Sequence, residues 1–476
     1  MHGRYKGLLF LLSVFLLWCA RSRAEEMMLT APAKIHPFVE CTIRLTLPEG
    51  GVLTIGVTDG YGVQKPLVEQ QPVQAGQLEI PYDGCSFEGM PLMSGTCIFS
   101  VELLGESGTQ YQTEAVTKIG SPGAAVEYAL PRSRVYYTEQ KTGWKVDCGV
   151  SGGDTVLLEI FSDKAMTQRV AKVARRVPGK SMFTFVWKGW FGKMRAEAGK
   201  YWCRVMLKDQ PETAKTFTLE VEEGPEPVEP LRITGPLLPE TDDPDELLEL
   251  LCAPLTVVDI DATAHQKIYA EPGERGGILG RVHGQSQGLC VLEIGEKNTK
   301  VGAWRHEDGA YIEGYVPTKL LKIVRPYEHY GVVVDKPLQE LRVYEYGRLV
   351  GRMRISTGLM EKHELAQETR AGAFITTDRM ITFESHGFDY DYPIRIDGGN
   401  LLHQLGRVSP EQGGFSAQMA TLGQKASAGC VRMDYRTDET HTINAYWLWT
   451  HLEWGTKVLV LDDPDAREAR LAELGE

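Results

Sequence analysis

The chain lacks most features of membrane and metal proteins. Beyond residues 8–18 it has no apolar run near the length of about 20 residues that spans a bilayer. Cys-x-x-Cys pairs and Cys/His clusters are absent from the sequence, so neither a metal nor another cofactor is expected. Nine cysteines in 476 residues are also too few for a disulfide scaffold.

Basic residues are scarce as well. The 51 Lys and Arg residues face 64 Asp and Glu residues, which gives a net charge of −13. The balance becomes −17 without residues 1–24, which hold four basic residues and no acidic one. Nucleic acids and anionic membranes bind basic faces, so the sequence predicts neither as a partner. The oligomeric state is left open.

A secretory signal peptide is predicted over residues 1–24. Arg4 and Lys6 precede the apolar run, and Ser22 and Ala24 are small residues at the −3 and −1 positions of a cleavage site. The apolar run is too short for a membrane anchor. We therefore expect an exported chain, secreted or held at the cell envelope, with no membrane span after cleavage.

Eight cysteines remain after this cleavage. If one of them is a free nucleophile, seven are left and at least one more is unpaired. We expect buried thiols, since burial is the common fate of free cysteine. A Cys148–Cys203 disulfide stays open as an alternative.

Short alternating runs predict a mainly β protein with several domains, because one core rarely exceeds roughly 250–300 residues. Two stretches repeat after about 104 residues: Leu53–Asp59 is similar to Leu157–Asp163, and Ile80–Gly84 is similar to Phe185–Gly189. We interpret residues 30–120 and 125–222 as two tandem β-sandwiches that act as spacers. They resemble FlgD-type immunoglobulin-like modules.

Two further segments precede the C-terminal part. Residues 223–251 are rich in proline and acidic residues and predict a linker, with a single helical turn at its end. Residues 252–325 return to short strands, and Gly314–Leu320 resembles the ending of a bacterial SH3-like barrel. Such barrels often bind cell-wall peptide in exported proteins. Its aromatic residues either line a groove or fill the core: Trp304, Tyr311 and Tyr315.

The most informative segment is Ser427–Met433, which places one thiol in a small-Gly-Cys turn. Cys430 is the candidate nucleophile, since a thiol needs only a nearby base or positive charge to become reactive. Gly429 lets backbone N–H groups approach an oxyanion, or merely permits the turn. Ser427 either orients the base or is an ordinary turn residue. Arg432 lowers the thiol pKa, holds a substrate carboxylate or forms a structural ion pair.

His403 is the candidate general base. It ends the run Pro393–Ile396 and Leu401–His403, which is interpreted as strand, and it precedes Cys430 by 27 residues. His386 is the rival, but it lies 44 residues from Cys430 and lacks a preceding strand. The Gly-, Ser- and Gln-rich residues 409–425 are interpreted as an inserted loop, which costs little.

These residues closely resemble the active-site signature of YkuD-type L,D-transpeptidases, a His followed by Ser/Thr-His-Gly-Cys-(Ile/Val/Leu)-(Arg/Asn). The chain departs from it at Ala428, where the family has a second histidine that shapes the site. Further stretches match in order over residues 326–463, namely Ile355–Gly358, Thr369–Phe374 and Gly455–Val460. Arg370 stands where proline is usual.

The resemblance implies a β-rich L,D-transpeptidase domain over residues 326–463 that acts on peptidoglycan stem peptides. His403 would activate Cys430, which forms an acyl-enzyme and leads to a 3→3 cross-link without a cofactor. An L,D-carboxypeptidase, in which water replaces the acceptor, is the first alternative. A non-catalytic peptidoglycan-binding protein is the second, and Ala428 is the reason to keep it.

Overall fold

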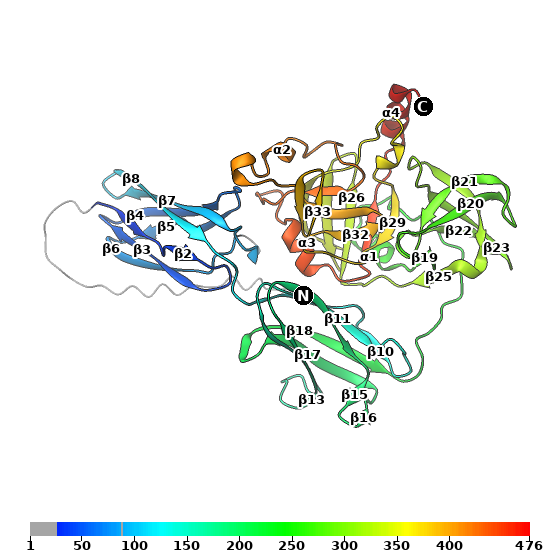
Figure 1. The fold of residues 1–476 in the computed structure, drawn as a ribbon, viewed down its shortest axis with the longest axis horizontal. Helices are drawn as coiled ribbons and strands as arrows, with labels where there is room; N and C mark the ends of the chain where they lie inside the picture. The colour runs from blue at the N-terminus through cyan, green and yellow to red at the C-terminus, as the bar shows by residue number, and fades with distance from the viewer. Residues whose placement is uncertain (1–25, 87–88) are drawn as a thin grey trace. The chain divides into compact units, whose positions relative to one another are not determined.

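The computed structural model describes residues 26–86 and 89–476, so the predicted signal peptide lies outside the described residues. The fold is mainly β, as predicted, and is built from several separate sheets (Figure 1). The described residues form two compact units, divided between Gly123 and Ala124.

The first unit contains a β-sandwich, called the first sandwich. Its two sheets have the strand orders β1-β3-β6 and β2-β8-β7-β4-β5. Every second residue of β7 is buried, the period expected when one sheet face covers a core. The rings of Tyr82 and Phe99, one from each sheet, meet edge to face at 5.7 Å. The strands are β1 (Met28–Thr30), β2 (Lys34–Ile35), β3 (Cys41–Leu47), β4 (Gly51–Asp59), β5 (Gln64–Val73), β6 (Gly76–Tyr82), β7 (Gly95–Gly105) and β8 (Gln110–Ile119).

The second sandwich opens the second unit, repeats this topology in its two sheets and adds a separate two-stranded β15–β16 sheet. Its sheets have the orders β9-β11-β14 and β10-β18-β17-β12-β13, and β10 pairs with β18 in parallel as β2 does with β8. Trp144 and Trp187 lie in a core shared by both sheets. The strands are β9 (Val126–Pro131), β10 (Val135–Tyr137), β11 (Trp144–Val150), β12 (Asp154–Phe161), β13 (Arg169–Val177), β14 (Ser181–Trp187), β15 (Trp190–Phe191), β16 (Met194–Arg195), β17 (Gly199–Leu207) and β18 (Gln210–Glu222).

A nine-residue helix, α1 (Pro244–Cys252), follows where one helical turn was predicted. Asp243 caps it by accepting the first free backbone N–H groups, and proline stands at its start. Leu247 and Leu251 of this helix are buried. Lys457 donates to the carbonyls of Leu250 and Ala253 and so fixes the end of the helix.

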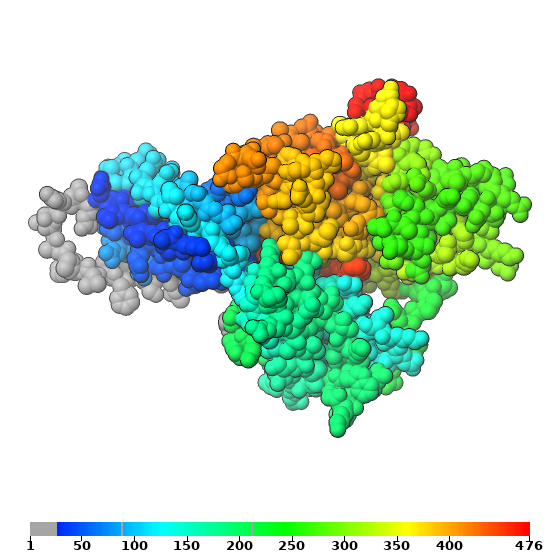
Figure 2. Space-filling view, in the orientation of Figure 1, coloured from blue at the N-terminus to red at the C-terminus, as the bar shows by residue number. Residues whose placement is uncertain are grey.

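The barrel segment, residues 252–325, forms a two-stranded sheet and a five-stranded sheet of order β21-β20-β24-β23-β22. Its core is continuous with that of the C-terminal segment, because Leu255 and Val257 share one apolar cluster with Val333 and Leu459. The green surface of the barrel segment lies against yellow and orange atoms of the C-terminal segment (Figure 2). The strands are β19 (Leu255–Val258), β20 (His265–Glu271), β21 (Arg275–His283), β22 (Cys290–Glu293), β23 (Asn298–Trp304), β24 (Tyr311–Pro317) and β25 (Leu321–Val324).

The C-terminal segment, residues 326–476, is built on an eight-stranded sheet of order β29-β35-β26-β27-β28-β34-β33-β32, with a separate β30–β31 hairpin. Pairs β26–β35 and β33–β34 are parallel. The strands are β26 (Tyr330–Asp335), β27 (Glu340–Glu345), β28 (Arg348–Ser356), β29 (Gly372–Ile375), β30 (Thr382–Ser385), β31 (Phe388–Asp391), β32 (Ile394–Asp397), β33 (Asn400–Gln404), β34 (Val431–Met433) and β35 (Lys457–Val460). The helices are α2 (Ser416–Met419), α3 (Ala445–His451) and α4 (Pro464–Leu474).

Cys148 and Cys203 both carry free thiols. The alternative of a Cys148–Cys203 disulfide is therefore wrong. The register places Cys148 of β11 opposite Phe183, whereas Cys203 of β17 lies opposite Ile160 in the other sheet. Both thiols are instead buried in the core of the second sandwich. No helix among the described residues has the length and apolar character needed to cross a membrane.

Candidate active site

The candidate nucleophile lies on a turn that only glycine permits. Gly429, directly before Cys430, has φ +107°, a conformation that L side chains rarely adopt. A Cβ at this position would lie 2.8 Å from Oδ1 of Asn400. Gly358 packs against Gly429, and a Cβ at Gly358 would lie 1.9 Å from the Gln367 carbonyl oxygen. The two glycines thus allow the close approach of three backbone segments around the thiol.

Hydrogen bonds fix this turn to the neighbouring segments. The Thr369 hydroxyl donates to the Gly429 carbonyl at 2.9 Å and accepts from the Gly358 N–H at 2.7 Å. The Thr357 carbonyl accepts from the backbone of Ser427 at 3.0 Å. The motifs around residues 355–358 and 369–374, found far from Cys430 in the sequence, therefore form the support of its turn.

Ser427 acts within the turn itself. Its Oγ donates to the Cys430 carbonyl at 2.5 Å and accepts from the Gly429 N–H at 3.2 Å. Of the two roles considered for this serine, the geometry fits the turn residue, because both bonds go to the backbone of the turn. The Gly429 N–H is engaged by the same hydroxyl, so it must exchange that partner before it can bind an oxyanion.

His403 lies on β33, beside the strand that follows the thiol. Its Nδ1 is 2.7 Å from the Gln404 carbonyl oxygen, which can only accept a hydrogen bond. Nδ1 therefore carries the proton in the neutral ring, and Nε2 is left with a free lone pair. The rings of Phe383 and Tyr390 meet the imidazole edge to face at 5.4 and 4.7 Å and enclose it.

The candidate nucleophile and the candidate base lie on neighbouring segments of the sheet. β33 and β34 are parallel, His403 lies opposite Arg432, and Cys430 directly precedes β34. Within residues 26–86 and 89–476 no hydrogen bond joins the thiol and the imidazole, so proton transfer between them requires a closer approach of the two side chains.

The electrostatics favour a neutral resting pair. Burial raises the pKa of Cys430 above its ordinary value, although a hydrogen bond from the Leu401 backbone and the charge of Arg432 act in the opposite direction. Burial lowers the pKa of His403 to about 4, while its bond to Gln404 opposes the shift. At pH 7 the site therefore holds a thiol and an unprotonated imidazole, which is the form required of a general base.

Arg432 carries a charge that no carboxylate in the described part of the chain neutralises. Its Nη1 donates to the Ala426 carbonyl at 3.1 Å, and the side chain is half-buried. The described residues therefore give no support to the alternative of a structural ion pair. Its other donors remain available to an anionic group of a ligand beside Cys430.

The rival histidine lies at the tip of the β30–β31 hairpin. His386 is exposed, and its Nδ1 contacts the Ser385 hydroxyl at 2.9 Å. The interpretation of residues 409–425 as an inserted loop agrees with the structure, where they hold only α2 and a short 3-10 helix. Gln418 fixes this loop by donating to the Tyr390 hydroxyl at 2.9 Å and accepting from the Gly406 N–H. The loop thus joins the aromatic enclosure of His403.

A cluster of three histidines was not predicted from the sequence. His265, His283 and His306, called here the histidine cluster, converge in the barrel segment with their ligand atoms within 4.8 Å of one another. They are separated by 18 and 23 residues, a spacing that matches no metal motif. Only the pairing of β20 with β21, which puts His265 opposite His283, could have indicated them.

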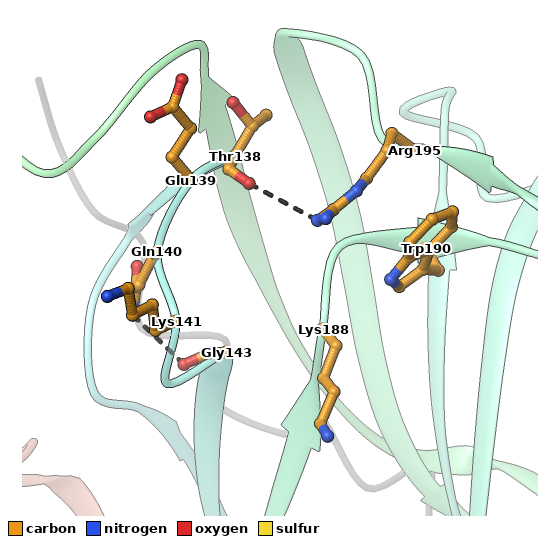
Figure 3. A pocket seen from close by; sticks show the side chains of 8 residues that line it. All are labelled: Thr138, Glu139, Gln140, Lys141, Gly143, Lys188, Trp190 and Arg195. Carbon is orange, nitrogen blue, oxygen red and sulfur yellow. Dashed lines mark hydrogen bonds between the residues drawn. The ribbon is translucent and has the colours of Figure 1, made fainter.

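A polar cavity of about 400 Å³ lies in the second sandwich, far along the chain from Cys430 (Figure 3). Arg195 stacks on the exposed Trp190 ring at 4.4 Å and points toward the Thr138 carbonyl. No predicted site residue lines it. Its lining consists of Thr138, Glu139, Gln140, Lys141, Gly143, Lys188, Trp190 and Arg195.

Comparison with known families identifies the C-terminal segment. Residues 329–460 match the family model of the YkuD L,D-transpeptidase catalytic domain. The predicted family resemblance is thereby confirmed for this segment, which is well under half of the chain. A search of curated proteins gave no match. The resemblances of the sandwiches and of the barrel segment remain predictions.

Solved structures of similar proteins include several L,D-transpeptidases. One from Xylanimonas cellulosilytica DSM 15894 is 23% identical over 28% of this chain and 60% of its own, with a TM-score of 0.21. Another from Mycobacterium tuberculosis H37Rv is 16% identical over 43% of this chain and 100% of its own, with a TM-score of 0.22. A fused Zn-dependent amidase/peptidase/peptidoglycan-binding domain-containing protein from Clostridium acetobutylicum ATCC 824 is 17% identical over 29% of this chain, with a TM-score of 0.21. The chain spans 53% of that protein's length.

Proposed function

We propose that the protein is an exported peptidoglycan L,D-transpeptidase with Cys430 as nucleophile and His403 as general base. The observation that supports the proposal is that His403 lies on β33, which pairs with β34, the strand that directly follows the glycine turn and Cys430. The family match of residues 329–460 supports the same reaction class.

The first half-reaction transfers an acyl group to the thiol. His403 Nε2 takes the proton of Cys430, and Sγ attacks the carbonyl carbon of the diamino acid at stem position three. The S–C bond forms, the C–N bond to the terminal D-Ala breaks, and the histidine returns the proton to the leaving amine. Backbone N–H groups near Gly429 and Cys430 stabilise the tetrahedral oxyanion.

The second half-reaction resolves the thioester. The side-chain amine of another stem peptide attacks the same carbonyl, its proton passes to His403, and the thiol is released. The product is a 3→3 cross-link, and no metal or cofactor enters either step. Ser427 and Thr369 position the turn, and Arg432 is proposed to bind a carboxylate of the stem peptide.

Two alternatives remain. Water instead of an amine as acceptor would make the protein an L,D-carboxypeptidase. A non-catalytic peptidoglycan-binding protein is favoured by Ala428, which is exposed at the position of the second family histidine, and by the raised pKa of Cys430. Incubation with purified sacculi separates the three: cross-linked dimers, shortened tripeptides or unchanged muropeptides are expected, respectively.

The nucleophile is tested by mass spectrometry of the intact protein with a carbapenem, a class that typically acylates this family. Wild-type protein should gain one adduct, and Cys430→Ser should gain none, because a serine hydroxyl is a far weaker nucleophile at neutral pH. Cys252→Ser is the matched control, since Cys252 is also half-buried and should leave the adduct intact. An adduct that persists in Cys430→Ser would refute the assignment.

A further inference from the structure

The histidine cluster has the geometry of ligands that surround a common point. The rings of His265 and His283 lie 4.3 Å apart, those of His265 and His306 4.5 Å, and those of His283 and His306 4.9 Å at 81°. The backbones are fixed, because His265 pairs with His283 across β20 and β21 and the His306 N–H donates to the Arg281 carbonyl at 2.8 Å. Three imidazoles from distant positions in the chain thus face one another.

A buried carboxylate orients the central ring. Nδ1 of His283 donates to Oδ1 of Asp397 at 2.8 Å, and both side chains are almost fully buried. Metal-ligating histidines almost always donate their second ring N–H to such an acceptor, which fixes the tautomer and directs the other nitrogen at the ion. The free nitrogen of His283 is Nε2.

Gly398 packs against the ring of His283 without blocking the lone pair of Nε2. A Cβ at Gly398 would lie 2.3 Å from Nε2 of His283 and 2.5 Å from both neighbouring ring carbons. Those three distances place it over the ring face rather than along the lone pair. His265 is exposed on β20, so an ion can enter from solvent on that side.

One contact must open when an ion binds. Arg370 donates to Nδ1 of His306 at 3.2 Å, at the long end of hydrogen bonds. Coordination through Nε2 of His306 requires a proton on Nδ1 and therefore displaces this donor. The charge of Arg370 is offset by Asp397, which it contacts at 2.5 Å, so the pair adds no net charge to the site.

We propose that the histidine cluster binds one divalent transition-metal ion of the zinc type, with His265, His283 and His306 as ligands and water in the fourth position. A tetrahedral ion with Zn–N bonds of about 2.0–2.1 Å needs nitrogens about 3.3 Å apart. The ligand atoms of the cluster lie within 4.8 Å of one another. Binding of the ion would therefore require the imidazoles to rotate and bring their nitrogens closer together by about an ångström.

All three ligands come from the barrel segment, and the hydrogen bond from His283 to Asp397 links the site to β32 of the C-terminal segment. The hairpin partner of β32, β33, carries His403. The ion would therefore stabilise the contact between His283 and this hairpin and would take no part in the acyl transfer, so the metal proposal does not depend on the proposed reaction.

The test uses the chain without residues 1–24, treated with a chelator and titrated with Zn²⁺ by calorimetry. One ion per chain is expected, with a dissociation constant below about 1 μM and a higher thermal midpoint, because an ion that binds only the folded state stabilises it. His265→Gln should weaken binding at least tenfold. This histidine is exposed, so its replacement should leave the fold intact.

Two further variants sharpen the result. Asp397→Asn should weaken Zn²⁺ binding about 10–100-fold, the range found when the acceptor behind a ligand is changed. His363→Gln, an exposed histidine outside the cluster, is the matched control and should bind as wild type does. Absorption of the Co²⁺ form should show tetrahedral bands without thiolate charge transfer, which would exclude cysteine as a ligand. Binding of less than one ion, equal affinity in His265→Gln, or a thiolate band would overturn the proposal.

Discussion

The β32–β33 hairpin has a histidine site at each end, and the two differ in what holds the imidazole. Near β32, the Asp397 carboxylate accepts from Nδ1 of His283. On β33, the Gln404 carbonyl accepts from Nδ1 of His403. Both arrangements leave Nε2 free. A carboxylate favours a ring that carries positive charge or a metal, whereas a neutral carbonyl inside an aromatic enclosure favours an uncharged base. The acceptor behind the ring thus decides which chemistry Nε2 supports.

Both sites also use a glycine to allow close packing. Gly398 covers the ring of His283, and Gly429 lies against Asn400 beside the thiol. In each case a Cβ would lie within 3 Å of a polar atom of the site. The supports of the two sites are neighbours, because Asn400 pairs with Asp397 across the hairpin. Single-residue variants therefore test whether one site can be disturbed without the other.

The largest effect is expected from removal of the base. His403→Ala should slow carbapenem acylation by about 10²–10⁴-fold, because the free Nε2 no longer takes the thiol proton. His386→Ala, the rival at the tip of the β30–β31 hairpin, should react like wild type. Single-turnover kinetics followed by intact mass measure both. The opposite pattern would show that His386 is the base.

The pH dependence is the second test of a neutral pair. His403 has its pKa lowered to about 4, so it stays unprotonated above that pH, and wild-type acylation should be level between about pH 6 and 8. In His403→Ala only the thiolate reacts. Because the pKa of Cys430 is raised, its thiolate fraction grows about tenfold per pH unit over this range, and so should the rate. A tenfold rise per unit in wild type would contradict general-base catalysis.

Arg432 should affect binding more than chemistry. A hydrogen bond to a charged group contributes about 1.5–3 kcal/mol, so Arg432→Gln should raise KM for a tetrapeptide stem roughly 10–100-fold. The value of kcat should change far less. Arg354→Gln, an exposed arginine of β28 paired with Asp438, is the control and should leave both constants unchanged. A loss in kcat with unchanged KM would assign Arg432 to the thiol instead of the substrate.

Local patterns made the nucleophile end predictable. Gly429 and Cys430 are adjacent in the sequence, and His403 ends an apolar strand, so each could be recognised within a few residues. The tandem sandwiches could be predicted for the same reason, because Leu53–Asp59 and Leu157–Asp163 preserve the strand pattern. Their repeated sheet orders follow from that pattern.

Contacts between distant segments were not predictable. Leu247 and Leu251 of α1 are buried against β26 and β35, which a linker composition did not indicate. The histidine cluster depends on the β20–β21 register and on a β32 carboxylate more than 100 residues away. Because the core is shared, residues 252–325 would lose apolar partners if they were expressed alone. Binding of the barrel segment to sacculi is therefore better tested with surface variants of the whole chain.

The smallest effect, and the one that separates the two ends, is expected from Gly398→Ala. The added Cβ would lie 2.3 Å from Nε2 of His283, and Gly398 has φ +49°, so the ring must shift. Zn²⁺ binding should weaken several-fold and the thermal midpoint should fall by a few degrees, because strain of this kind costs about 1–3 kcal/mol. Carbapenem acylation should stay within about twofold of wild type, since the support of Cys430 comes from Thr369 and Gly358. Gly399→Ala, with open space around its Cβ, is the neighbouring control. Equal losses of metal binding and acylation in Gly398→Ala would show that the hairpin transmits strain and that its two ends are a single coupled site.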